Sequence, residues 1–121
     1  MNNIVVIDSN TDFYTLIASK LSSLDLNLTF IQDPFSFIDS IGEKNYDLVI
    51  ISHVLKGVYT PEFIKFIRNF KYYGKILVLS SDPNAKELYK LVDCVSPKCV
   101  DRVTLTNTVQ GLLNNPIGCE Y

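Results

Sequence analysis

The sequence predicts an α/β fold in which a five-stranded parallel sheet is covered by helices on both faces, giving a three-layer sandwich. Short apolar runs alternate with amphipathic segments along the 121 residues, and this length fits a single domain. Residues 47–52 (DLVIIS) are apolar on both faces of an extended strand, which is typical of the middle of a parallel sheet.

Five segments have the composition of buried strands. The last of them is the weakest, because it is only three residues long and contains a Ser. Right-handed crossovers between parallel strands favour the order 2-1-3-4-5, as in flavodoxin-like folds. The predicted strands are residues 3–7, 26–31, 47–52, 75–80 and 94–96.

The segments between the strands carry helix signals. Four helices have a capping side chain, and in two of them Pro stands directly after the cap. Between residues 80 and 97 the chain is short, so the fourth of five helices, over 84–92, is expected to be reduced. The predicted caps are Asn10 or Ser9, Asp33, Thr60 and Asp101, and the predicted stops are Gly42 and Gly74.

Apolar residues recur at helical spacing in the four longer helices and are expected to face the sheet. They are Phe13, Leu16, Ile17, Leu21 and Leu24 in the first helix; Phe37, Ile38 and Ile41 in the second; Phe63, Ile64, Ile67 and Phe70 in the third; and Val103, Leu105, Val109, Leu112 and Leu113 in the last.

The composition narrows the class of protein. Hydrophobic residues make up 47% and charged residues 20%, which indicates a folded core, and a net charge of −2 gives no basic excess for nucleic acid. No apolar run is long enough to span a bilayer, so we expect a cytoplasmic protein. The spacing of Cys94, Cys99 and Cys119 fits neither a disulfide framework nor a zinc site. We expect a domain over 1–113 and a tail over 114–121.

Over residues 3–113 the sequence resembles a response-regulator receiver domain of the CheY type. The resemblance rests on IVVID at the first strand, YDLVIIS at the third and KILVLSS at the fourth, with Pro97 after the fifth. Such domains hold Mg²⁺ with two adjacent acids after the first strand and accept a phosphoryl group on an Asp that ends the third. A hydroxyl ends the fourth strand, an aromatic residue lies on the fifth, and a Lys precedes a Pro.

The resemblance implies a degenerate phosphorylation pocket. Asp8 matches the first acid, but Ser9 stands at the second acid and Ser52 at the phosphoacceptor. Ser80 matches the hydroxyl position. If Pro97 anchors the register, Ser96 replaces the Lys, and this is the register that we prefer because Pro fixes the turn.

In the other register the family's Lys is Lys98. Neither register retains the aromatic residue. One carboxylate beside hydroxyl groups is a weak site for Mg²⁺, and a serine cannot form the labile acyl phosphate that an aspartate forms.

The sequence therefore favours a pseudo-receiver: a non-enzymatic module with no metal or cofactor that binds a protein partner without phosphorylation. Homodimerisation stays open. The alternatives are a flavodoxin-like domain that binds a small ligand or cofactor, for which the turn after the first strand has no Gly, and a regulator that responds to another modification. A nucleophile built from Ser52, His53 and Asp8 is disfavoured, because adjacent strand residues point to opposite faces.

The sequence also predicts two groups of residues that lie at the surface. A basic group around the third helix is expected to be a solvated face or a docking site for an acidic partner. Three tyrosines do not fit the apolar stripes, so they are candidates for an exposed recognition patch. The basic group is Lys65, Arg68, Lys71 and Lys75, and the tyrosines are Tyr59, Tyr72 and Tyr73.

Overall fold

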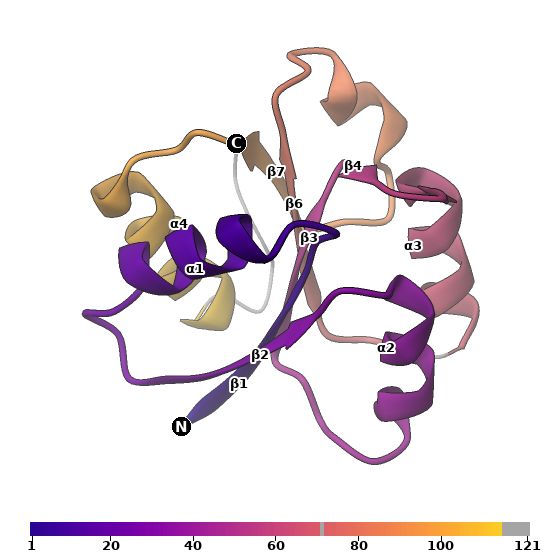
Figure 1. Cartoon of the computed structure of the whole chain (residues 1–121), viewed down its shortest axis with the longest axis horizontal. Helices are drawn as coiled ribbons and strands as arrows, with labels where there is room; N and C mark the ends of the chain where they lie inside the picture. The colour runs from indigo at the N-terminus through magenta and orange to yellow at the C-terminus, as the bar shows by residue number, and fades with distance from the viewer. Residues whose placement is uncertain (71, 115–121) are drawn as a thin grey trace.

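The computed structural model describes residues 1–70 and 72–114 and shows one five-stranded parallel sheet (Figure 1). The order is β2-β1-β3-β6-β7, which confirms the predicted order 2-1-3-4-5 once a small separate hairpin takes the labels β4 and β5. The sheet strands are β1 (Asn2–Ile7), β2 (Leu26–Ile31), β3 (Leu48–Ser52), β6 (Lys75–Ser80) and β7 (Cys94–Pro97).

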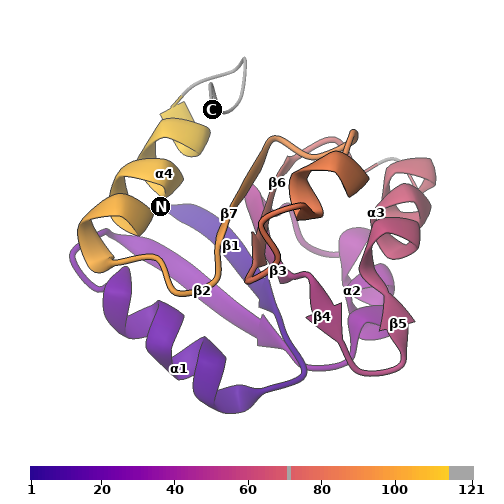
Figure 2. The same cartoon turned by 90° about the horizontal axis from the view of Figure 1, so that it is seen from above.

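Helices cover both faces of the sheet, so the predicted three-layer sandwich is confirmed. In Figures 1 and 2, α1 and α4 lie on one side and α2 and α3 on the other. Alternate residues of β1 enter two separate cores: Ile4 and Val6 pack with α1 and α4, whereas Val5 and Ile7 pack with α2 and α3. The helices are α1 (Thr11–Lys20), α2 (Pro34–Ile41), α3 (Thr60–Asn69) and α4 (Arg102–Asn114).

Three predicted helix caps form, and one is corrected. The side chains of Asn10, Asp33 and Asp101 accept hydrogen bonds from backbone N–H groups in the first turns of α1, α2 and α4. Tyr59, not Thr60, is the residue before α3. The Thr60 hydroxyl instead lies 3.1 Å from the Ser52 carbonyl oxygen and 2.7 Å from that of His53, so it ties the start of α3 to the end of β3.

Part of the predicted core is at the surface. Leu16 in α1, Val103 in α4 and Phe70 directly after α3 continue the helical spacing, but each is about half exposed or more. Conversely, Tyr72 is buried, and its ring meets that of Phe37 edge to face. The sheet accepts only about a third of each helix surface, so the outer members of a stripe stay in solvent.

The expected fourth helix is reduced further than predicted. Only one turn of 3-10 helix forms, η1 (Ala85–Leu88), so the described chain has four α-helices. Tyr89 then takes an extended conformation and turns its side chain inward, which ends the helix. The predicted loop after β3 contains the hairpin β4 (Val54–Leu55) and β5 (Val58–Tyr59), where Gly57 has a φ of 76° that favours glycine.

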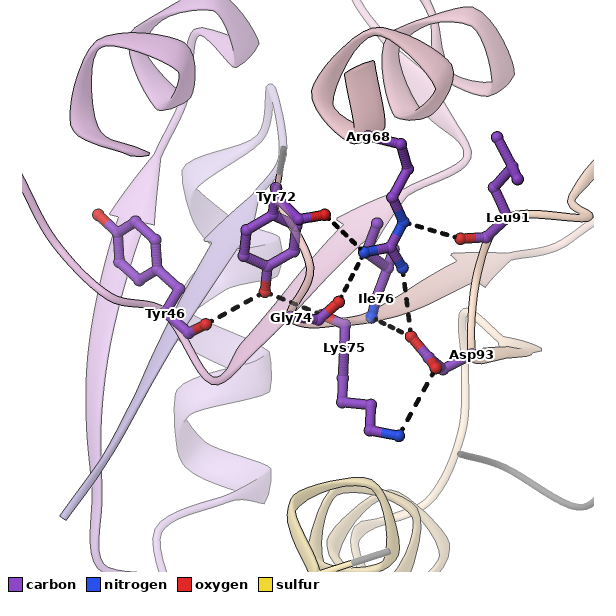
Figure 3. A network of polar contacts seen from close by, with 8 residues as sticks. All are labelled: Tyr46, Arg68, Tyr72, Gly74, Lys75, Ile76, Leu91 and Asp93. Carbon is purple, nitrogen blue, oxygen red and sulfur yellow. Dashed lines mark hydrogen bonds and ion pairs between the residues drawn. The ribbon is translucent and has the colours of Figure 1, made fainter. Parts of the chain in front are cut away.

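Arg68 holds the segment that replaces the fourth helix (Figure 3). Its guanidinium donates to the carbonyl oxygens of Leu91, Tyr72 and Gly74 at 2.8–3.1 Å and lies 3.4 Å from the Asp93 carboxylate. Asp93 also accepts from the N–H of Ile76 at 2.8 Å and lies 3.7 Å from the Lys75 ammonium. Arg68 and Lys75 therefore belong to a structural network, not to a free basic face, and Lys71 is outside the described residues.

The predicted division into a domain over 1–113 and a tail over 114–121 stays a prediction. Helix α4 continues to Asn114, the first residue of that tail, and 115–121 lie outside the described residues. Of the cysteines in the described part, Cys94 is buried and Cys99 is exposed. No helix among the described residues is long and apolar enough to cross a membrane.

Gly74 was predicted as a helix stop, but its position is explained by a close contact. A Cβ atom at residue 74 would collide with the ring and hydroxyl of Tyr72. The Tyr72 hydroxyl lies 3.3 Å from the Tyr46 carbonyl oxygen and 3.1 Å from that of Lys75, and burial raises the pKa of this phenol. The ring is therefore fixed and has little room to give way.

We expect Gly74→Ala to lower the free energy of unfolding by about 1–3 kcal/mol, because a buried ring must move to admit one methyl group. Gly111→Ala is the matched control: nothing lies within 4 Å of its added Cβ, and it sits in α4. The control should be neutral or stabilising by up to about 1 kcal/mol, since alanine favours a helix. Urea unfolding measures both. An equal effect of the two substitutions would contradict the close contact between residue 74 and the Tyr72 ring as the reason for the glycine.

Candidate functional site

The carboxyl ends of the central strands bring the predicted pocket residues to one edge of the sheet. Asp8 follows β1, which pairs with β3 and places Ser52 beside it. Ser80 ends β6 and pairs with Pro97 of β7, and Lys98 comes next. This is the edge at which open parallel sheets place their binding sites.

Asp8 is the centre of the site. Its carboxylate is 2% exposed. The Ser52 hydroxyl donates a short hydrogen bond to Oδ2, and the backbone N–H of Asn10 donates to Oδ1 at 2.8 Å. The Lys98 ammonium lies 3.7 Å from Oδ2. Asp8 therefore has a counter-charge and a donor on each oxygen.

Lys98, not Ser96, reaches the pocket, so the preferred Pro97-anchored assignment of the lysine position to Ser96 is wrong in this structure. Ser96 is buried on the α1 and α4 side, with its hydroxyl 3.8 Å from the Cys94 thiol. Pro97 ends the strand, and the N–H of Lys98 bonds to the Ser80 carbonyl at 3.0 Å. The Lys98 side chain then passes over the Phe13 ring, 4.6 Å from its centroid, toward Asp8.

The other predicted serines are engaged elsewhere. The Ser9 hydroxyl accepts from the backbone N–H of Lys56 at 2.9 Å, which joins the loop after β1 to the hairpin. The Ser80 hydroxyl accepts from the N–H of Asp82 at 3.0 Å and so shapes the loop before η1. Of the six predicted positions, the structure brings Asp8, Ser52 and Lys98 together.

His53 points away from Asp8, as the alternation along a strand requires. Its Nδ1 makes a short hydrogen bond with the Tyr89 hydroxyl, and the two rings meet edge to face. Burial, with a smaller contribution from Tyr59, raises the pKa of Tyr89. The sequence carries no signal for this pair, since Tyr89 was expected in a helix. The arrangement is not a Ser-His-Asp triad, because Ser52 and His53 face different neighbours.

The donor set is poor for a metal ion. Among residues 1–70 and 72–114 there is no group of three or more His, Cys, Asp or Glu side chains that could hold one. The two Asp8 oxygens already accept hydrogen bonds, and the nearest charge is a cation. Such a site offers Mg²⁺ one carboxylate in place of the several oxygens that it prefers.

The comparisons with known proteins agree with the geometry of the fold. No protein-family model matches the sequence, and no similar curated protein was found. The chemotaxis response regulator CheY4 of Vibrio cholerae superposes with a TM-score of 0.82 at 17% identity, over 93% of this chain and 99% of that one. A signal receiver domain of an HD domain-containing protein from Pseudomonas fluorescens gives 0.81 at 21% identity, over 93% and 94%.

The chain has the fold of a CheY-like receiver domain. The response regulator TrrA from Thermotoga maritima, solved in complex with Mg²⁺ and BeF, superposes on it with a TM-score of 0.81 at 23% identity, over 93% of this chain and 100% of that one. The receiver fold thus accounts for nearly the whole chain, while the pocket is made of different side chains from those that the resemblance implies.

We expect Asp8→Ala to lower the free energy of unfolding by about 2–4 kcal/mol, because the buried Ser52 hydroxyl loses its acceptor and the partly buried Lys98 loses its counter-charge. Asp39→Ala, at an exposed carboxylate in α2, is the control and should change stability by no more than about 0.5 kcal/mol. Chemical denaturation measures both variants. A near-neutral Asp8→Ala would show that the pocket network does not contribute to the stability of the fold.

Proposed function

We propose that this chain is a pseudo-receiver: a signalling module with the receiver fold that binds a protein partner without being phosphorylated, and that is not an enzyme. One observation carries the proposal. The hydroxyl of Ser52, at the position that the resemblance assigns to the phosphoacceptor, is a hydrogen-bond donor to Asp8. The side chain at the nucleophile position therefore stabilises the remaining carboxylate, Asp8, by donating a hydrogen bond to it.

The charge balance of the pocket supports this proposal. A pocket of clustered carboxylates needs a divalent cation to relieve their repulsion. Among the six predicted pocket residues Asp8 is the one carboxylate, and Lys98 lies beside it. The pair has no net charge, so little is gained by adding Mg²⁺, which gives up its hydration reluctantly. The pocket resembles a permanently neutralised state and not one that awaits a phosphoryl group.

The loop after β1 does not favour the ligand-binding alternative. The Ser9 carbonyl accepts from the Gln32 side chain at 3.0 Å, and the Ser9 hydroxyl accepts from Lys56 N–H. The polar groups of this turn are thus used within the chain. We therefore propose that the chain acts in the cytoplasm and that its partner is a protein.

We expect millimolar Mg²⁺ to leave the melting temperature unchanged, and neither acetyl phosphate nor beryllofluoride to modify the protein. The physical reason is that Asp8 is the one carboxylate among the predicted pocket residues, and it already has hydrogen-bond donors and a lysine beside it. The measurement is a thermal shift assay with and without each reagent, together with intact-mass analysis after treatment with acetyl phosphate.

The double variant Ser9→Asp/Ser52→Asp is the positive control, because it restores both missing acids. At a Mg²⁺ concentration ten times its Kd, the variant should gain about 1.4 kcal/mol of stability from the metal. A rise in melting temperature of the unmodified chain with Mg²⁺, or phosphate incorporated at Ser52, would overturn the proposed function.

A further inference from the structure

A groove lies between α3 and the segment that follows η1. It encloses about 300 Å³. One wall comes from α3 and the residue before it, and the other from residues 88–91, within the range over which the fourth helix was expected. Its lining residues are Tyr59, Pro61, Glu62, Ile64, Lys65, Leu88, Tyr89, Lys90 and Leu91.

The groove exposes large apolar side chains. Tyr59, Leu88 and Leu91 are 59%, 47% and 48% exposed, whereas Ile64 and Tyr89 are buried at its floor. The Tyr89 hydroxyl is occupied by His53, so the phenol is not a free polar group seeking a ligand. The cost of leaving such surface in water is relieved when an apolar partner covers it.

Each wall of the groove also carries a lysine. Lys65 on α3 and Lys90 on the facing segment are both exposed, and Glu62 is the one acid among the lining residues. Lys65, Lys90 and Glu62 give the lining residues a net charge of +1, whereas the chain as a whole has a net charge of −2. Cations on both sides of an apolar floor select a partner that carries carboxylates beside its apolar side chains.

We propose that this groove binds an acidic, amphipathic segment of a partner protein, with apolar side chains against Tyr59, Leu88 and Leu91 and carboxylates near Lys65 and Lys90. The inference rests on the proposed function in one respect, that the partner is a protein. It adds the place and the chemistry of the contact. Arg68 and the Asp93 network hold the wall in place from behind, so the groove is formed before the partner arrives.

The test uses random 12-residue peptides displayed on phage and selected on the immobilised full-length chain. We expect the enriched peptides to be acidic and to contain large apolar residues. The most enriched peptide is then synthesised, and its Kd is measured by fluorescence anisotropy. No enrichment, or enrichment of basic or uncharged sequences, would overturn the inference.

Charge variants locate the site. Lys65→Glu/Lys90→Glu should weaken binding of the selected peptide by at least about tenfold. Lys44→Glu/Lys56→Glu makes the same change in charge at exposed lysines that do not line the groove, and it should change the Kd by less than about twofold once long-range effects are screened by 0.15 M salt. Equal losses in both variants would show a non-specific charge effect and refute the site.

A second pair of variants tests the apolar wall. Leu88→Ser removes a groove side chain, and Leu16→Ser removes one on α1 with the same exposed fraction, 47%. Only Leu88→Ser should weaken binding of the peptide, with a Kd that rises several-fold. Sedimentation velocity of the peptide-free chain is run in parallel: a dimer that is lost in Lys65→Glu/Lys90→Glu would assign the groove to a second copy and overturn the peptide assignment.

The anisotropy measurement, repeated with Mg²⁺ and beryllofluoride, separates this inference from the proposed function. If the peptide binds the groove only in the presence of Mg²⁺ and beryllofluoride, the groove assignment stands and phosphorylation independence fails. If selected peptides bind without either reagent and their Kd is unchanged in the groove variants, the groove assignment fails while the proposed function is retained.

Discussion

Asp8 is an almost fully buried carboxylate at the end of a central strand, and the arrangement around the carboxyl edge of the sheet follows from the need to satisfy it. A buried charge is tolerated only with donors and a counter-charge. The loop after β1 supplies the Asn10 N–H, β3 supplies the Ser52 hydroxyl, and the chain beyond β7 supplies Lys98. Three segments that are distant in sequence are thereby fixed relative to one another.

The same edge is the basis of the proposed pseudo-receiver function, because the pocket of the receiver fold is built here from a different set of side chains. In the family that the sequence resembles, a metal ion compensates several acids. Here the acids are reduced to Asp8, and a lysine and a hydroxyl provide the compensation within the chain. The two apolar cores on either side of the sheet contain none of the charged residues at its edge, so the same layers can form around a different pocket.

The short segment between β6 and β7 makes two contacts with the rest of the chain. Directly after η1, Tyr89 takes an extended conformation and packs inward onto His53. At its end, Asp93 accepts from Ile76 N–H and pairs with Arg68 of α3. A full helix would have covered the flank of α3. A single turn leaves Leu88 and Leu91 at the surface, and the groove beside α3 results from this loss.

The sequence by itself determined the strand order, both helical layers and the position of Asp8 and Ser52, because strand periodicity, helix caps and Pro positions are local signals. It did not determine which residues on a helical stripe are buried: Phe63 is in the core, whereas Phe70, seven residues later, is half exposed because α3 ends at Asn69. Only the tertiary structure decided between Ser96 and Lys98, because a long side chain crosses from one strand end to another. The His53–Tyr89 and Arg68–Asp93 contacts are likewise set by packing across 25 residues or more of chain, and no local pattern encodes such a distance.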